Sequence, residues 1–239
     1  MKTLYTVCLG FALLAGCASV NDSTLNDSKL NDSKLNDSKL NDSKLNDYNL
    51  DDPKTRDKIA VDALALKKLQ EHGPKGRELS YAQNSQIPYT GWAKEVFTKS
   101  GQVGALWYYK DGKKESHNQW YENGQKRLEY HYKDGQLDGL QHLWHENGQK
   151  SLDFYCKDGK QDGPMIAWYD NGQKKREVSF KAGAKDGLLA TWWPNGNKQL
   201  EFRYKAGKRD GLQTQWSFEG QKHGTIRFKA GAYQWDGTK

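Results

Sequence analysis

The sequence predicts an all-β fold, an antiparallel meander of tandem 24-residue β-hairpin repeats that together form a single curled sheet. A tryptophan recurs at every twenty-fourth position, and a glycine follows each tryptophan at a constant distance. Self-similarity at a fixed period is the sequence signature of a repeat architecture, in which each unit packs on its neighbours. The two series are Trp120, Trp144, Trp168, Trp192 and Trp216, with Gly124, Gly148, Gly172, Gly196 and Gly220.

Each repeat contains two short strands and two turn signals. In the copy with the clearest pattern, we expect strands over residues 140–144 and 150–156, with turns at residues 147–148 and 158–159. These turns carry Asn-Gly and Asp-Gly, which tolerate the positive φ angles of tight hairpins, so we expect both dipeptides to adopt them. Strands joined by such turns pair antiparallel and give a meander.

The apolar and aromatic residues of these strands lie on even numbers, and many charged residues lie on odd numbers. Strand side chains alternate between faces and the repeat length is even, so we predict that every hairpin sends its aromatic residues to one face. This face would form the core, covered by curvature, by a helix or by a partner. The even-numbered set includes Trp144, Leu152, Phe154, Ile166, Trp168, Val178, Phe180, Trp192, Leu200 and Phe202, and the odd-numbered set includes Asp153, Glu177 and Glu201.

The repeat unit resembles a known repeat family. Its consensus, Gly-Leu-x-x-x-Trp-x-x-Asn-Gly-Gln-Lys followed by apolar alternation and Tyr-Lys-Asp-Gly-Lys, is similar to the MORN-repeat variant of bacterial proteins over residues 87–237. Many proteins of this kind are grouped as YwqK-type antitoxins. The resemblance implies a β-hairpin repeat fold and a binding role, and it supplies no catalytic residues.

The N-terminus has the layout of a secretory signal, with a basic residue before an apolar run over residues 3–15 that is too short to span a bilayer. The sequence Leu-Ala-Gly-Cys at residues 14–17 resembles the bacterial lipobox, in which the cysteine is acylated and becomes the first residue of the mature chain. We therefore predict a signal peptide over residues 1–16 and a lipid on Cys17. The lipid would hold the protein in the cell envelope, and Ala18 favours the outer membrane of a Gram-negative host.

A tether and a helix are expected before the repeats. Residues 17–52 contain a repeated Asn-Asp-Ser-Lys-Leu pentapeptide, whose one apolar residue in five cannot form a buried face, so we predict a disordered tether. Residues 53–73 are predicted to form an amphipathic helix that begins with Pro53 and ends at Gly73. Its apolar stripe would consist of Ile59, Ala63, Leu66 and Leu69.

The net charge of +7 lies on the repeats. Residues 91–239 hold 25 Lys and Arg against 18 Asp and Glu, whereas residues 1–90 hold 12 of each. A basic excess favours anionic lipid headgroups or an acidic protein, although it equally keeps the polar face of a sheet hydrated. Nucleic acid is not expected as a partner of an envelope lipoprotein.

The sequence gives little support for catalysis. Cys156 is the only thiol expected in the mature chain, and it occupies a strand position that other repeats fill with Tyr or Phe. His142 and His145 lie three residues apart, which on a strand places them on opposite faces and prevents them from sharing one metal ion. No serine elbow, phosphate loop or dinucleotide fingerprint occurs. We therefore predict a protein that is not an enzyme, with no catalytic residue, metal site or cofactor.

Two classes of function remain. The first is a membrane-anchored protein-interaction module that captures a toxin or an envelope protein, with an antitoxin or immunity role as its specific form. The alternative is a cell-wall or glycan binder, because aromatic, Gly-rich hairpin repeats also resemble choline- and glucan-binding modules. The contact residues predicted on the face opposite the core tryptophans are Trp193, Tyr169, Tyr155 and Arg203.

Overall fold

The computed structural model describes residues 48–74 and 78–234. All of these residues belong to one compact unit. The predicted signal peptide, the lipidation site Cys17 and the tether up to residue 47 therefore lie outside the described residues.

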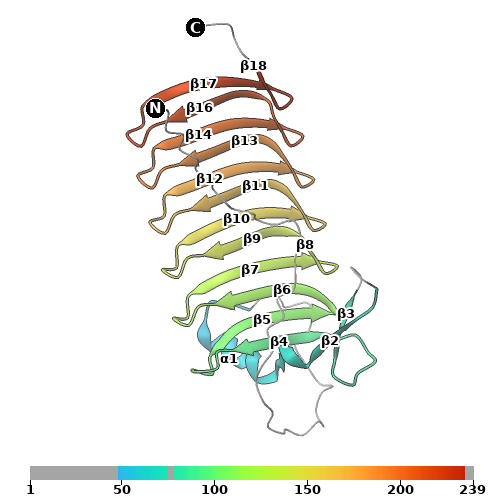
Figure 1. The fold of residues 1–239 in the computed structure, drawn as a ribbon. Helices are drawn as coiled ribbons and strands as arrows, with labels where there is room; N and C mark the ends of the chain where they lie inside the picture. The colour runs from blue at the N-terminus through green and yellow to red at the C-terminus, as the bar shows by residue number, and fades with distance from the viewer. Residues whose placement is uncertain (1–47, 75–77, 235–239) are drawn as a thin grey trace, which may run out of the picture. The chain divides into compact units, whose positions relative to one another are not determined.

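The repeats form one long antiparallel meander, as the sequence predicted (Figure 1). Nearly every strand pairs with its predecessor and its successor in the chain, within an open sheet of 16 strands. Three two- or three-residue strands, β8 (Gln136–Leu137), β15 (Lys208–Arg209) and β18 (Ala232–Gln234), follow hairpin turns. The main strands are β4 (Gly91–Val96), β5 (Val103–Lys110), β6 (Lys113–Trp120), β7 (Lys126–Lys133), β9 (Gly139–Trp144), β10 (Lys150–Lys157), β11 (Lys160–Trp168), β12 (Lys174–Lys181), β13 (Ala184–Trp192), β14 (Lys198–Lys205), β16 (Gly211–Trp216) and β17 (Lys222–Lys229).

The two kinds of turn differ in backbone conformation. In the turn after β10, both Asp158 and Gly159 have positive φ, at 48° and 74°, as a tight hairpin with two central residues requires. In the Asn-Gly turn before β10, Gly148 has a φ of 82° but Asn147 stays outside the positive-φ region. The expectation of positive φ at both dipeptides is therefore wrong for the asparagines, whose side chains serve another purpose described below.

The prediction that all even-numbered aromatic residues share one face is wrong. Leu143 of β9 pairs with Leu152 of β10, so an odd-numbered residue lies beside an even-numbered one. The same change of parity occurs at the next turn, where Leu152 pairs with Ala167. The two pairs are separated by even numbers of residues, 8 and 14, so each strand reverses the relation between residue number and face. An even repeat length preserves parity between equivalent strands only.

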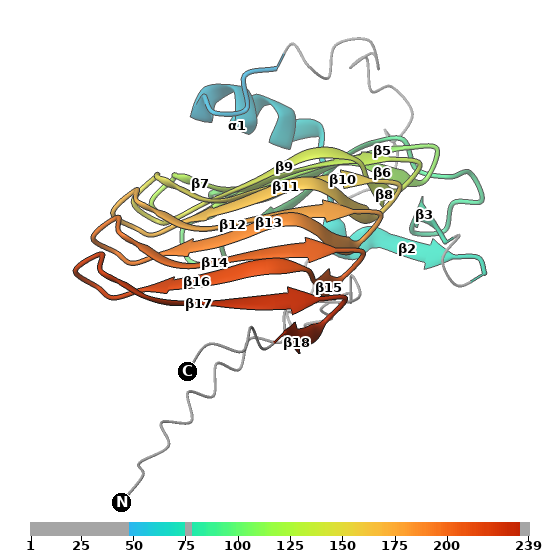
Figure 2. The same ribbon diagram turned by 90° about the horizontal axis from the view of Figure 1, so that it is seen from above.

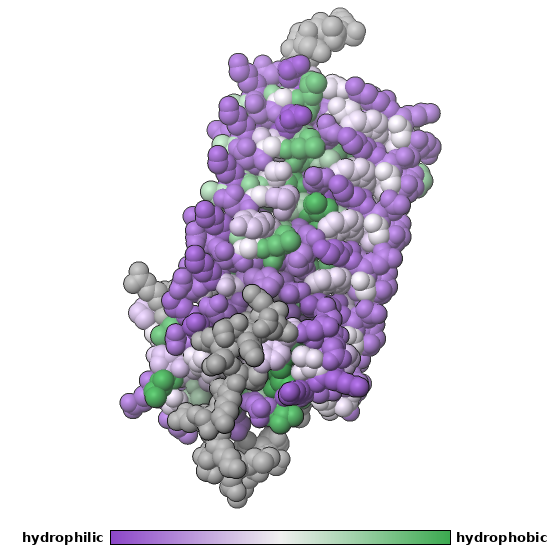
Figure 3. Space-filling model, turned by 180° about the vertical axis from the view of Figure 1, so that it is seen from behind, coloured by the Kyte–Doolittle hydropathy of each residue, from purple (hydrophilic) through white to green (hydrophobic). Residues whose placement is uncertain are grey.

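The sheet consequently has two different faces. One face, which we call the tryptophan face, carries the repeat tryptophans together with Glu129, Asp153, Glu177 and Glu201, as the strand registers show. The opposite aliphatic face contains a core of Val178, Leu189 and Phe202, against which Met165, Phe180, Leu200 and Tyr204 pack. Seen from behind the view of Figure 1, a stripe of apolar side chains runs along the array between hydrophilic ones (Figure 3).

The N-terminal end of the tryptophan face is covered. There α1 (Pro53–Asp62) lies beside the sheet (Figure 2), and Ile59 and Ala63 enter a core with Trp92, Leu106, Tyr108 and Trp120. The last pentapeptide unit also contributes, because Tyr48 and Leu50 pack against this core. Tyr48 and Leu50, which the prediction assigned to the disordered tether of residues 17–52, are therefore part of the packed structure.

The helix is shorter than the predicted range of residues 53–73. It begins as expected, since the Asp52 carboxylate accepts hydrogen bonds from the backbone N–H groups of Lys54 and Thr55. It ends at Asp62, because the chain then becomes β1 (Leu64–Ala65) and pairs in parallel with β4. A continued helix would have left the edge of β4 without these hydrogen bonds. The remaining residues form a 3-10 turn (Leu66–Lys68) and a separate hairpin of β2 (Leu69–His72) and β3 (Leu79–Ala82).

Candidate functional site

A ladder of ion pairs and aromatic rings runs along the tryptophan face. In each of four repeats, a lysine contacts the carboxylate three residues later, with N–O distances of 2.6–2.9 Å. Three of these ammonium groups also lie over the tryptophan ring of the next repeat, at 5.1–5.6 Å from its centroid. The pairs are Lys126–Glu129, Lys150–Asp153, Lys174–Glu177 and Lys198–Glu201.

This ladder explains the recurring carboxylates of the sequence. Each is paired within its own strand and repeats along the sheet, which is the arrangement of a structural surface and differs from a single reactive site. The tryptophan rings from Trp144 onward are half-buried, and lysine cations cover part of the faces of Trp144, Trp192 and Trp216. The tryptophans from Trp144 onward are therefore neither fully buried core residues nor freely exposed platforms.

Two of the four predicted contact residues connect neighbouring repeats. Tyr169 donates its hydroxyl hydrogen bond to the carbonyl oxygen of Trp192 at 2.9 Å, and the Trp193 indole N–H contacts the carbonyl of Trp216 at 3.4 Å. Tyr121 and His145 make the equivalent contacts in their repeats. Both Tyr169 and Trp193 are half-buried, and burial raises the pKa of the Tyr169 hydroxyl. Their structural role is to join one repeat to the next.

The other two predicted residues, Tyr155 and Arg203, are exposed at equivalent positions of their repeats, but they lie on the tryptophan face and not on the opposite face as predicted. Each side chain lies over a glycine of the following strand, because a Cβ on Gly163 would meet Tyr155 at 3.4 Å and one on Gly211 would meet Arg203 at 3.6 Å. These two side chains are available for contact with a partner.

Sequence reasoning missed a second ladder, formed by the asparagines of the Asn-Gly turns. Asn147 donates to the carbonyl oxygen of Asp170 in the next repeat at 2.7 Å and accepts from the Gln149 N–H at 3.0 Å. The 24-residue recurrence of asparagine was the available signal, but it was assigned to turn conformation alone. The equivalent donors are Asn123, Asn171 and Asn195.

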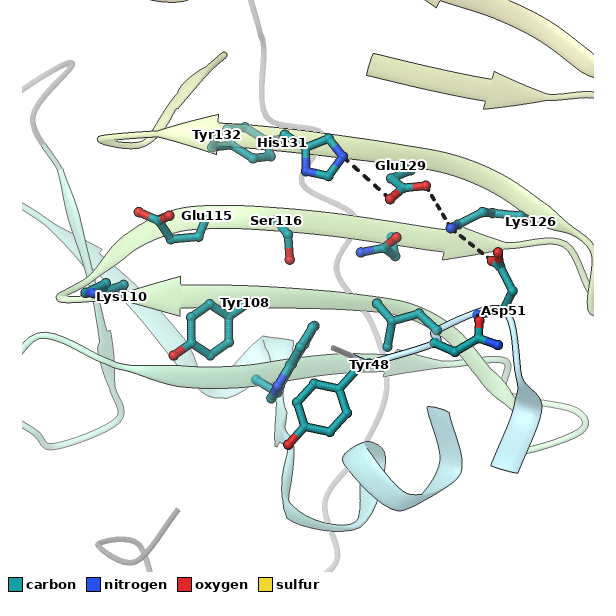
Figure 4. Close-up of a pocket in the computed structure, with 14 residues that line it drawn as sticks. Tyr48, Asp51, Tyr108, Lys110, Glu115, Ser116, Lys126, Glu129, His131 and Tyr132 are labelled. Carbon is teal, nitrogen blue, oxygen red and sulfur yellow. Dashed lines mark hydrogen bonds and ion pairs between the residues drawn. The ribbon is translucent and has the colours of Figure 1, made fainter. Parts of the chain in front are cut away.

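A polar groove of about 490 Å³, which we call the N-terminal groove, opens on the tryptophan face beside the segment 48–51 (Figure 4). Four neighbouring strands form its floor, and their registers bring alternate residues into one patch. The sequence did not predict this groove, because the groove depends on where residues 48–51, which precede α1, lie against the sheet. The floor includes Trp92, Tyr108, Ser116, Asn118, Glu129 and His131.

The charged groups of this groove are paired with one another. The Glu129 carboxylate lies 3.5 Å from the His131 ring and 2.8 Å from the Lys126 ammonium group, which also contacts Asp51 at 2.9 Å. The hydrogen bond from His131, and then that from Lys126, lower the pKa of Glu129 to about 2. Glu129 is therefore ionised at neutral pH and contacts both Lys126 and His131.

The basic charge is concentrated in the second half of the array. Residues 174–234 hold 13 Lys and Arg against five Asp and Glu, a net charge of +8, whereas residues 91–173 hold 11 against 12, a net charge of −1. The turn residue that is aspartate at Asp134 and Asp158 is alanine at Ala182, Ala206 and Ala230, which removes acidic groups from this edge. Exposed apolar residues of the same half are Leu212, Phe218, Ile226 and Tyr233.

His142, His145 and Cys156 make contacts that stabilise the fold. His142 contacts Asp153 at 2.7 Å on the tryptophan face, whereas His145 contacts the carbonyl of Trp168. Cys156 is buried on the aliphatic face. Within residues 48–74 and 78–234, no group of three or more His, Cys, Asp and Glu side chains could hold a metal ion. In the same part of the chain, no helix has the length and apolar character needed to cross a membrane.

A single-layer sheet of hairpins joined by repeating hydrogen bonds defines the chain as a tandem β-repeat protein. Two segments, residues 117–134 and 161–182, match the family described as MORN repeat variant. The chain therefore contains repeats of this kind, and such repeats are generally modules that interact with proteins or membranes. A search of curated proteins found no match.

Proposed function

We propose that this chain is a lipid-anchored envelope protein, not an enzyme, whose repeat sheet captures another protein. The observation that supports this most directly is the single-layer sheet in the second half of the array. Beyond β7, no described element outside the sheet forms a second layer, so apolar and basic side chains meet solvent together. Exposed surfaces of this kind are typical of binding sites.

The charge of this half specifies the class of partner. Arg203 and Arg227 are exposed on the tryptophan face of neighbouring repeats, beside the exposed Leu212. Basic groups around apolar side chains are complementary to a protein surface with acidic groups around an apolar centre. A toxin that acts at the envelope, or a resident envelope protein, would both satisfy this description, and capture of a toxin would make the chain an immunity factor.

Capture is tested with the mature chain as bait in extracts of the bacterial envelope. We expect an acidic partner that is bound at low salt, released as ionic strength rises, and lost with the Arg203→Glu/Arg227→Glu variant. The matched control is Lys133→Glu/Lys157→Glu, which reverses two exposed charges in the first half of the array. A partner that binds this control less well than the arginine variant would contradict the proposed surface.

Anchoring rests on the lipobox-like residues 14–17 and is tested separately. Acylation requires the thiol of Cys17, so Cys17→Ser should yield an unprocessed or soluble protein when cells are fractionated. Normal processing and complete membrane retention of this variant would contradict the lipoprotein assignment. In a Gram-negative host, we expect the wild-type protein in the outer-membrane fraction.

The alternative function is glycan or cell-wall binding through the repeat aromatics. The half-buried Trp144, Trp168 and Trp192 keep this alternative open, but the ring faces of Trp144 and Trp192 are partly covered by Lys126 and Lys174. If the rings bound sugars, Lys174→Ala should strengthen binding to insoluble cell wall by uncovering Trp192. No change in sedimentation with cell wall would contradict this use of the tryptophan ladder.

A further inference from the structure

The N-terminal groove contains two buried polar atoms that have no hydrogen-bond partner. These are the Ser116 hydroxyl oxygen and the Asn118 amide oxygen, on residues that are 6% and 3% exposed. Both side chains project from β6 on the same face and line the groove, where Ser116 is seen between Tyr108 and His131 (Figure 4). A buried polar group without a partner costs on the order of 1–3 kcal/mol, so two in one groove call for an explanation.

The repeat fold itself does not require these residues. The positions equivalent to Ser116 in later repeats are mostly leucine, and those equivalent to Asn118 vary between apolar and polar residues. An apolar side chain at either position is therefore compatible with the hairpin. The polar pair is specific to the repeat that forms the groove, and the equivalents are Leu140, Pro164, Leu188 and Leu212, and His142, Ile166, Ala190 and Thr214.

The surroundings of this pair select an uncharged ligand. Lys126 contacts Asp51 and Glu129, and His131 contacts Glu129, so each of these groups already has a partner within the groove. The hydrogen-bonding capacity that remains is a hydroxyl, which donates and accepts, and an amide oxygen, which accepts. A ligand that fits must therefore donate hydrogen bonds without bringing a net charge.

The lining and the volume of the groove further restrict the class of ligand. Strand pairing places Tyr108 beside Ser116, and Trp92 beside Tyr108, with 5.2 Å between the two ring centroids. Both rings are almost fully buried, so only a small apolar part of each borders the groove, and an apolar border next to hydrogen-bonding groups suits a molecule with one apolar side and several hydroxyls. The volume of about 490 Å³ lies within the range of about 300–1,000 Å³ that is usual for small-ligand sites.

We propose that the N-terminal groove binds a neutral sugar unit, as a monosaccharide or disaccharide segment of a glycan. Hydroxyl groups of the sugar donate to the Asn118 amide oxygen and exchange hydrogen bonds with the Ser116 hydroxyl. The apolar side of the sugar ring lies toward the edges of Trp92 and Tyr108. This site is separate from the basic half of the array to which we assign protein capture, and it does not use the tryptophan ladder.

The test uses the mature chain with chitobiose, cellobiose and maltose as probes, and saturation-transfer NMR with titration as the measurement. We expect at least one of these neutral disaccharides to bind the wild-type protein. Asn118→Leu and Ser116→Ala should each weaken that binding about tenfold, the effect of losing roughly 1.4 kcal/mol. Neither variant should lower the melting temperature, because each removes a buried group that lacks a partner.

Gln213→Leu is the matched control. Gln213 is also a buried amide whose oxygen has no partner, but it lies on the aliphatic face, four repeats further along the array. Its replacement should leave disaccharide binding unchanged. The proposal is overturned if none of the three disaccharides binds, if binding survives both groove substitutions, or if digalacturonate binds more tightly than all three. Because protein capture is assigned to Arg203 and Arg227, Asn118→Leu should still retain the acidic partner, which distinguishes failure of this site from failure of the proposed function.

Discussion

The Arg56 guanidinium of α1 lies 4.7 Å from the centroid of the Trp120 indole ring. In later repeats a lysine takes this place, as Lys174 does over Trp192 and Lys198 over Trp216. The strand before β6 is β5, which begins with Val103 where β7, β12 and β14 begin with a lysine, and α1 supplies the cation for Trp120 instead. The helix therefore ends the ladder of the tryptophan face, in the manner of a capping unit.

This capping role predicts that Arg56→Ala lowers the free energy of unfolding by about 1–2 kcal/mol, because Arg56 is buried and its side chain packs as well as carrying charge. Lys174→Ala should cost under about 1 kcal/mol, since its ammonium group is more exposed. Urea unfolding measures both. Equal losses for the two variants would show that α1 is not a special end of the array.

Burial distinguishes the tryptophans from one another. Trp120 is 2% exposed, so Trp120→Ala should cost about 3–5 kcal/mol, as for a large side chain removed from a core. Trp168 is only half-buried, so Trp168→Ala should cost about half as much. Thermal and urea unfolding of the two variants check this order. A larger loss for Trp168 would place the core at the centre of the array.

The contact between Tyr169 and the Trp192 carbonyl predicts a small effect on the coupling of repeats. Tyr169→Phe keeps the ring and removes the hydrogen bond, which should cost about 0.5–1.5 kcal/mol. Hydrogen exchange should become faster at the turns on both sides of the lost bond. Loss of partner binding with unchanged exchange would instead support the original prediction that Tyr169 is a contact residue.

Because His117 is largely buried, we expect the free energy of unfolding to fall in weak acid. This histidine stacks on Trp107 with ring centroids 4.6 Å apart, and burial, followed by the charge of Lys114, lowers its pKa from 6.5 to about 4. The unfolded chain then binds a proton more readily than the folded chain as the pH falls from 6.5 towards 4, so unfolding is favoured in this window. The loss should reach about 2–3 kcal/mol, and His117→Phe should remove most of it. A pH dependence that is identical in this variant would contradict the assignment.

The packing of Tyr48 leads us to expect that the last pentapeptide unit contributes to stability and that the earlier units do not. Tyr48 packs on the N-terminal core, where the preceding units carry serine. Tyr48→Ser should therefore lower stability by about 1–2 kcal/mol through lost burial. Deletion of residues 21–45 should leave the melting temperature unchanged, because their composition offers no apolar face. A deletion that destabilises the domain as much as Tyr48→Ser would show that the tract packs on the sheet.

Some features of this protein follow directly from its sequence. The 24-residue recurrence of tryptophan and glycine sets the number and order of the hairpins, because a repeat buries its apolar residues only against its neighbours. The Asp52 cap and Pro53 fix where the helix begins, because capping is local. Alternation within single strands did not predict the face of Tyr155 and Arg203, which lie beside the tryptophans.

Other features depend on contacts between strands. Leu143 and Leu152 lie on the same face because of the number of residues between them in the chain. Alternation within one strand does not reveal this number. The end of α1 at Asp62 is decided by the open edge of β4, which offers the following residues better hydrogen bonds than a longer helix. The groove around Ser116 and Asn118 exists because α1 packs on the sheet and places the preceding residues 48–51 beside it. The sequence determined the repeating unit, whose interactions are local, and the tertiary structure decided the faces, the cap and the groove, whose interactions join residues far apart in the chain.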